Sequence, residues 1–199
     1  MIKIEIKSIE NYLYVVCNFI AETRIKEFKG NFYKMGIICE YYAIENSVFN
    51  SFINKPIEFE EYLYEKYGNP DGIYHLEGET FFYLDKAWDI AVFLLKQNDT
   101  TNKKILSKLY GKPINKEMEG YSFINSEDVK LICEVITNLT EYQIENAYDE
   151  EKMIKDEIYK SGWLNKKNNW DYILNHVRTI QRAFTVASEK NNMLIISKS

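Results

Sequence analysis

The sequence predicts an α+β fold, a helix-rich single domain whose small central sheet is covered by several helices. Segments dense in β-branched and aromatic residues lie at residues 36–44 and 193–196. Between them, apolar residues recur every three or four positions over much of the chain, which is typical of amphipathic helices. Each such element must bury its apolar side against another, so we expect these elements to share one core.

The composition of the chain limits its structure and its partners. With 199 residues, of which 46% are hydrophobic and 28% charged, the chain can bury a core without a metal or a disulfide. Its three cysteines (Cys17, Cys39 and Cys133) have no close spacing, so no disulfide framework or zinc motif can be written. A formal net charge of -5 and a pI near 5.3 give no cationic surface for nucleic acid.

The hydropathy pattern also bears on localisation. No uninterrupted apolar run reaches the roughly 20 residues that span a bilayer, and the first eight residues alternate charge with isoleucine instead of forming a signal peptide. We therefore expect a cytoplasmic protein without a membrane segment, and we predict no cofactor.

Turn residues and apolar spacing place the individual elements. Residues 36–44 form a core strand, and Pro56 separates the two short helices that follow it. Gly68-Asn-Pro-Asp-Gly72 opens a surface loop that runs to Thr80. We further expect a modest helix over 101–110, a short strand over 121–124, a helix from 126 to 139 capped by Asn125 or Ser126, a capping box at Thr140-Glu-Tyr-Gln143, and a long helix over 170–187. The last strand, residues 193–196, is expected to pair beside the strand over 36–44.

A buried helix begins at Leu84-Asp85-Lys86-Ala87-Trp88. The residues from Trp88 to Leu95 are apolar on nearly every side of a helical projection, so this helix should be central in the fold. Asp85 precedes it, at the position where a short carboxylate can cap the free amides of the first turn. We predict that Asp85 is the N-cap and that Trp88 packs in the core.

The ordered segments resemble the YfbM-like family of bacterial proteins, a domain family of unknown function. The resemblance covers residues 35–199 and is carried by Met35-Gly-Ile-Ile, Leu84-Asp-Lys-Ala-Trp88, Ile105-Leu-Ser-Lys-Leu-Tyr-Gly111, Ser126-Glu-Asp-Val-Lys130, Tyr148-Asp-Glu-Glu-Lys-Met153 and Glu157-Ile-Tyr159. It implies the fold of that family but no activity or catalytic residue. Members often carry a histidine where this chain has Ala91-Val92, and a proline where it has Lys160, so a role for that histidine cannot apply here.

The resemblance also bears on the N-terminus. Members of the family usually begin at the Met-Gly pair, here Met35-Gly36. Residues 1–34 are therefore expected to be either an N-terminal extension or a mis-assigned start.

Motifs that fix chemistry by their spacing, such as a P-loop or a nucleophile elbow, are missing from the sequence. Asp71, His75, Glu77 and Glu79 are potential metal ligands, but a solvated polar loop explains them better, so we predict no metal site. His176 would be a general base if a carboxylate faced it, although a histidine at the edge of the core is the simpler interpretation. These features favour a protein that is not an enzyme.

Two groups of residues remain as candidate sites. Asp85, Lys86 and Trp88, with Glu40 and Tyr42 of the first strand, could line a pocket in which the indole stacks on a small ligand. The carboxylates Glu150, Glu151, Asp156 and Glu157 could dock a basic protein partner. We therefore predict a non-catalytic binding or protein-interaction module, in the manner of an immunity or accessory protein. The alternative is a small-molecule enzyme or ligand sensor with a pocket near Trp88.

Overall fold

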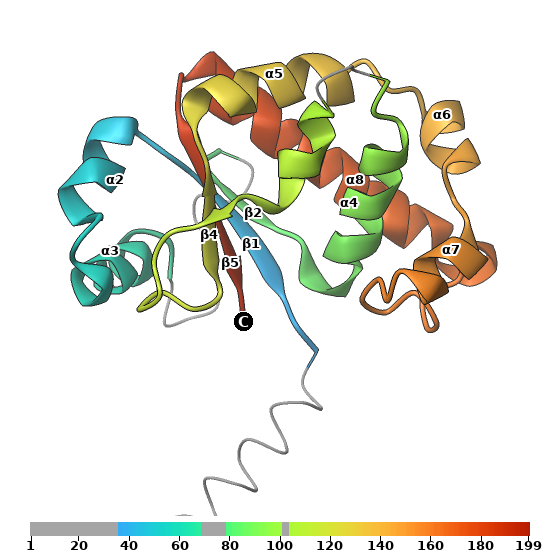
Figure 1. Cartoon of the computed structure of the whole chain (residues 1–199), viewed down its shortest axis with the longest axis horizontal. Coiled ribbons are helices and arrows are strands. Elements are labelled where there is room, and N and C mark those ends of the chain that lie inside the picture. Colours follow the sequence, from blue (N-terminus) through green and yellow to red (C-terminus); the bar gives the residue numbers. More distant parts are fainter. Residues whose placement is uncertain (1–35, 69–78, 101–103) are drawn as a thin grey trace, which may run out of the picture. The chain divides into compact units, whose positions relative to one another are not determined.

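The computed structural model describes residues 36–68, 79–100 and 104–199. Every described helix and strand belongs to one compact unit, Ile37–Ser199. This unit contains one sheet with helices packed on it (Figure 1), so the predicted α+β class is confirmed.

Across the described residues, five strands form one sheet in which every neighbouring pair is antiparallel. Its order is β2-β1-β5-β4-β3, with bounds β1 Cys39–Ile44, β2 Phe81–Tyr83, β3 Lys112–Pro113, β4 Tyr121–Ile124 and β5 Met193–Lys198. The predicted pairing of the first and last strands is confirmed, because β1 lies beside β5 with Tyr41 opposite Ile196. Neither of the short strands β2 and β3 was predicted from the sequence.

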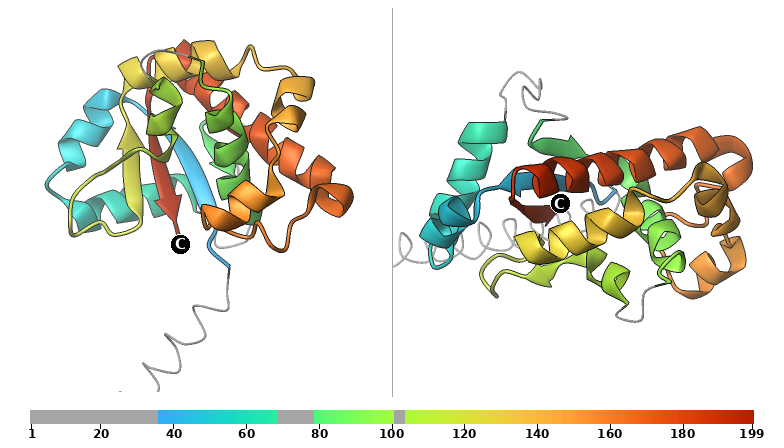
Figure 2. Two further views of the ribbon diagram at one scale, coloured as in Figure 1. Left: turned by 45° about the vertical axis from the view of Figure 1, so that its right-hand side comes forward. Right: turned by 90° about the horizontal axis from the view of Figure 1, so that it is seen from above.

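The sheet separates two apolar cores. Side chains alternate across a strand, so Tyr41 and Ala43 face one core while Tyr42 and Ile44 face the other. Helices α2 (Asn46–Phe52) and α3 (Pro56–Tyr67) cover the second face, as Figure 1 shows on its left. Helices α4 (Trp88–Gln97), α5 (Ser126–Ile136) and α8 (Lys166–Glu189) cover the first, and Figure 2 shows α5 and α8 running side by side over it.

Helix α4 is the central helix that the sequence predicts. All residues from Trp88 to Leu95 are buried, since α8 packs on one side of α4 and the 3₁₀ helix η2 (Ile105–Tyr110) on another. The predicted N-cap is wrong, however. Asp85 is itself the first residue of a 3₁₀ turn, η1 (Asp85–Ala87), has a φ of 40° and makes no capping hydrogen bond. Its carboxylate instead accepts a hydrogen bond from the Tyr172 hydroxyl of α8, at 2.7 Å.

The predicted caps of two later helices are confirmed. Asn125 Oδ1 accepts from the amide of Asp128 at 2.8 Å and so begins α5. Thr140 and Gln143 form the predicted capping box of α6 (Glu141–Asn146), which α7 (Glu150–Lys155) follows. The helix expected over 101–110 is present in its described part as the 3₁₀ helix η2, ended by Gly111 with a φ of 70°. In the predicted loop over 68–80, residues 69–78 lie outside the described part.

We expect Leu94→Ala to lower the free energy of unfolding by about 2–5 kcal/mol, because it removes a fully buried side chain from the centre of the core. The matched control is Leu131→Ala in α5, where the leucine is 44% exposed. This control should lower the free energy of unfolding by less than about 1 kcal/mol. Urea titrations of the two variants measure the difference, and equal effects would show that α4 is not central.

Candidate functional site

The structure does not bring the five predicted pocket residues together. Glu40 and Tyr42 lie on the α3 face of the sheet, where the Tyr42 hydroxyl donates to Glu40 Oε2 at 2.6 Å. They line a cavity of about 300 Å³ together with Glu60 and Tyr64 of α3. Trp88 belongs to the core on the opposite face. A sheet therefore separates the two halves of the predicted pocket.

Asp85 and Lys86 belong to a third environment, next to α8. The Tyr172 hydroxyl donates to Asp85 and lies 3.4 Å from the amide of Lys86, while the Lys86 side chain is exposed. Burial, followed by the hydrogen bond to Asp85, raises the pKa of Tyr172, so this hydroxyl remains a donor at neutral pH. These contacts fix η1 on α8 and account for Asp85 without a ligand.

His176 lies one turn beyond Tyr172 on α8. Its Nδ1 is 2.7 Å from the Tyr172 carbonyl oxygen, and its ring packs edge-on against the Tyr172 ring, with the centroids 4.4 Å apart. The side chain is buried, and burial lowers its pKa from the ordinary value. The carboxylate of Asp85 is bound by Tyr172 and makes no hydrogen bond to His176 in the described structure. The arrangement supports the interpretation of His176 as a histidine at the edge of the core.

A buried carboxyl group that was not among the predicted site residues holds several elements together. Asp89 in α4 is only 9% exposed. Its Oδ1 accepts from the Tyr110 hydroxyl at 2.6 Å and its Oδ2 from the Tyr159 amide at 2.8 Å. Asp89 therefore joins α4 to the end of η2 and to the segment that follows α7. The sequence contains a signal for this role of Asp89, because an aspartate inside an otherwise apolar helix needs buried hydrogen-bond partners.

Trp88 packs beside this carboxyl group. Its ring lies 6.2 Å from the Tyr159 ring in a stacked arrangement and 6.4 Å from the Tyr110 ring in an edge-on one. The ammonium of Lys198, at the end of β5, lies 5.0 Å from the centroid of the indole. The indole Nε1 is buried and has no hydrogen-bond partner among the described residues.

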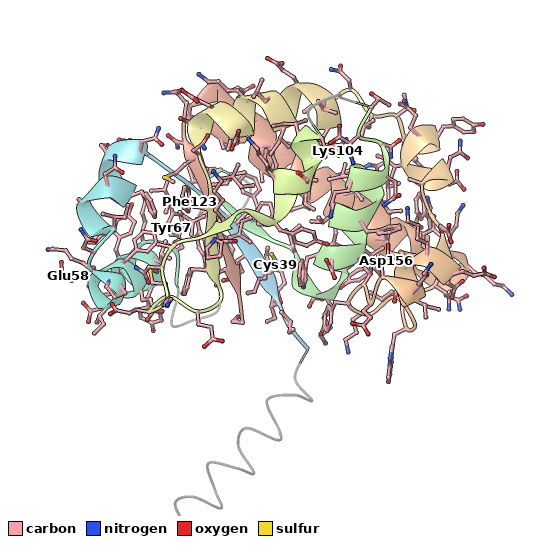
Figure 3. The ribbon with its side chains drawn as sticks, in the orientation of Figure 1. Cys39, Glu58, Tyr67, Lys104, Phe123 and Asp156 are labelled. Atoms are coloured by element: carbon pink, nitrogen blue, oxygen red, sulfur yellow. The ribbon has the colours of Figure 1, made fainter. Side chains whose placement is uncertain are left out.

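The predicted acidic residues lie on and after α7, and all of them are exposed. Asp149 caps the helix, Glu150 and Glu151 form its first turn, and Asp156 and Glu157 follow it. Figure 3 shows Asp156 on the surface, on the other side of the sheet from Tyr67. The apolar part of this surface was not predicted from the sequence, although the indole of Trp163 is 79% exposed and Ile154 is 55% exposed.

Of the four potential metal ligands on the 68–80 loop, Asp71, His75 and Glu77 lie outside the described residues. Within the described ranges, no three histidine, cysteine or acidic side chains gather in a way that could hold a metal ion. No helix in the described part of the chain is long and apolar enough to cross a membrane.

The fold and this arrangement define an α+β domain with a buried aromatic cluster at the start of its central helix. Residues 35–197 match the family model described as a domain of unknown function (DUF1877), and the chain therefore belongs to that family. A crystal structure of YfbM from Escherichia coli, described as a protein of unknown function, has a similar fold, with a TM-score of 0.57 at 13% sequence identity. The similarity covers 81% of this chain and 99% of that one, and the predicted YfbM-like resemblance is confirmed. No curated protein matches the chain.

We expect Tyr110→Phe to lower the free energy of unfolding by about 1–3 kcal/mol, because it leaves one oxygen of the buried Asp89 without its donor. Tyr142→Phe is the matched control, because this tyrosine is 71% exposed. Its effect should stay within about 0.5 kcal/mol. If urea unfolding gives the same stability for both variants, Asp89 does not hold the elements together.

The pKa shift of His176 predicts a dependence of stability on pH. Because burial lowers the pKa of the folded imidazole, the unfolded chain takes up this proton at a higher pH than the folded chain does. The contribution to stability is fully present above the ordinary value of 6.5 and is lost as the pH falls through the folded pKa. We expect His176→Gln to lose less stability than the wild type between about pH 7.5 and about pH 5. Parallel losses in urea titrations at the two pH values would contradict this assignment.

Proposed function

We propose that this domain is a non-catalytic protein-interaction module whose partner presents a basic surface with an apolar side chain at its centre. The observation that carries the proposal is the exposed indole of Trp163 in the same segment as the carboxylates Asp156 and Glu157. Tryptophan is enriched among the few residues that supply most of the energy of a protein interface. A tryptophan that is 79% exposed is therefore a candidate anchor for a partner.

The ammonium of Lys160 lies 5.2 Å from the centroid of this indole, but the segment that precedes it in the chain is mostly acidic and indicates the kind of partner. Residues 149–157 carry five carboxylates and two lysines, and the carboxylates are all exposed. One of the two lysines, Lys152, donates to Gln97 Oε1 at 2.6 Å and so is directed toward α4. Exposed carboxylates steer a basic partner toward such a surface and reject an acidic one.

The segment between α7 and α8 is held in a fixed conformation. Glu157 and Lys160 have φ values of 54° and 63°, in the left-handed region that non-glycine residues seldom occupy. The residues between them are anchored inward, because the Tyr159 amide donates to the buried Asp89 and its ring stacks on Trp88. A surface that is already ordered loses less entropy when a partner binds.

A cytoplasmic location is part of this proposal. Cys39 and Cys133 both carry free thiols, which suits a reducing compartment. A partner of this kind would be a cytoplasmic protein with a basic face.

The test is to capture proteins at low salt on the immobilised chain, to purify the captured protein and to measure its dissociation constant by titration calorimetry. We expect Trp163→Ala to weaken binding about tenfold or more, as loss of an anchor does. Replacing Glu150, Glu151, Asp156 and Glu157 by their amides should weaken binding further and reduce its dependence on salt.

Tyr142→Ala is the control, because this tyrosine is similarly exposed but belongs to α6, outside the segment. It should bind the captured protein as the wild type does. The proposal is overturned if nothing is captured at low salt, or if the Trp163 and amide variants bind like the wild type.

A further inference from the structure

A second cavity lies next to the Trp88 cluster, at the end of the sheet where β5 finishes. It has a volume of about 530 Å³, within the range of small-molecule sites, and is formed by the end of η2, the connection from β3 to β4 and the last residue of β5. Its lining includes Tyr110, Pro113, Lys116, Glu119, Tyr121 and Lys198. None of these belongs to the α7 surface of the proposed interaction, so this cavity is a separate site.

Lys198 supplies the cation of the cavity. Its ammonium lies 5.0 Å from the Trp88 ring centroid and 5.3 Å from that of Tyr110, so two aromatic faces hold it. Among the described residues, no carboxylate forms an ion pair with it. The buried carboxyl group of this region, Asp89, accepts its hydrogen bonds from Tyr110 and Tyr159 instead. An ammonium carries three donors, and those of Lys198 are available to an anion that enters the cavity.

Cys39, the residue opposite Lys198 in strand β1, does not supply a negative charge to this cation. Cys39 pairs with Lys198 in the β1–β5 ladder, and burial raises the pKa of its thiol. The thiol is therefore neutral at physiological pH. At the mouth of the cavity, Lys116 adds a second cation and Glu119 a single carboxylate, and Glu119 is exposed. The charges that face the cavity therefore sum to a net positive charge.

A backbone hydrogen bond to Gly120 fixes the position of Lys198. Its amide donates to the Gly120 carbonyl oxygen at 2.9 Å. Gly120 has a φ of 90°, and a Cβ there would lie 2.8 Å from the Lys198 carbonyl oxygen, so only glycine allows this approach. The connection between β3 and β4 is thereby fixed against β5, and the cavity is preformed.

The remaining wall favours a flat apolar body. Tyr110 presents an aromatic ring and Pro113 adds an apolar surface. Tyr121 lies opposite Ser197, so its ring is on the α3 face of the sheet and not beside Lys198. We propose that this cavity binds a small organic anion with a flat apolar body, its anionic group on the ammonium of Lys198 and its body against Tyr110 and Pro113. Such a ligand satisfies the unpaired cation and the apolar wall together.

Trp88 makes the proposal measurable, because its indole lies against the Lys198 ammonium. The chain has three tryptophans, so Trp163→Phe with Trp170→Phe leaves Trp88 as the only indole. In this background we expect sodium benzoate to change the fluorescence with saturation in the millimolar range. Benzamide, which has the same shape without the charge, should give no saturation. Phenyl phosphate would saturate as benzoate does, and the tighter of the two identifies the anionic group.

Lys198→Met keeps the aliphatic stem of the side chain and removes its charge, so we expect about tenfold weaker binding of benzoate. Lys116→Met is the matched control at the mouth and should change binding far less. Amide shifts of Gly111 and Gly120 in a heteronuclear NMR titration locate the ligand independently of fluorescence. The proposal is overturned if benzoate and benzamide behave alike, if Lys198→Met binds benzoate as the wild type does, or if inorganic phosphate alone saturates the site equally well.

Discussion

The antiparallel pairing of β1 with β5 is the constraint on which the rest of this structure depends. It joins Cys39–Ile44 to Met193–Lys198, segments that are about as far apart as the described chain allows. Both strands are buried on both faces, so each supplies one layer to the core under α3 and another to the core under α4. Neither core can form until the end of the chain arrives, because β5 lies between β1 and β4. The ladder also sets the place of Lys198, since its register puts that residue opposite Cys39 and on the α4 face.

On this sheet, one buried carboxyl group connects the two surfaces to which functions are proposed. Asp89 binds Tyr159, which precedes the exposed Trp163, and it also binds Tyr110, which lines the cavity at the end of β5. Trp88 packs between the same two tyrosines. The Leu84-Asp-Lys-Ala-Trp88 segment, the most specific marker of the family resemblance, thus leads into the cluster that supports both surfaces. Its direct role is packing and hydrogen bonding inside the fold.

Much of the fold could be predicted because its main elements are long or strongly patterned. The apolar spacing in α5 and α8 and the β-branched density of β1 and β5 are local signals that the final packing reinforces. The two-residue strand β3 and the three-residue strand β2 were missed because segments so short carry no period. Asp85 was misassigned because its partner, the Tyr172 hydroxyl, lies 87 positions away. A capping rule considers only the next few residues and cannot foresee such a contact.

The candidate sites were harder to predict than the fold, for a related reason. A sequence identifies residues that are able to bind a ligand, but it does not show on which side of the sheet each side chain lies. The predicted pocket therefore combines Glu40 and Tyr42 with Trp88, although the sheet separates them. Lys198 and Trp163, on which the two proposals depend, are not conspicuous in the sequence. A lysine near the end of a chain and a tryptophan between two helices are each ordinary when considered alone.

Lys160 illustrates what only the structure adds. The backbone of this lysine has a φ of 63°, in the left-handed region that a proline ring cannot adopt. The backbone at this position therefore differs from any that proline allows, in the segment that presents Trp163. Of the two proposed sites, the α7 surface therefore depends on this local backbone conformation. The cavity depends instead on the β1–β5 register, on Gly120 and on the Trp88 cluster, which are features of the fold itself.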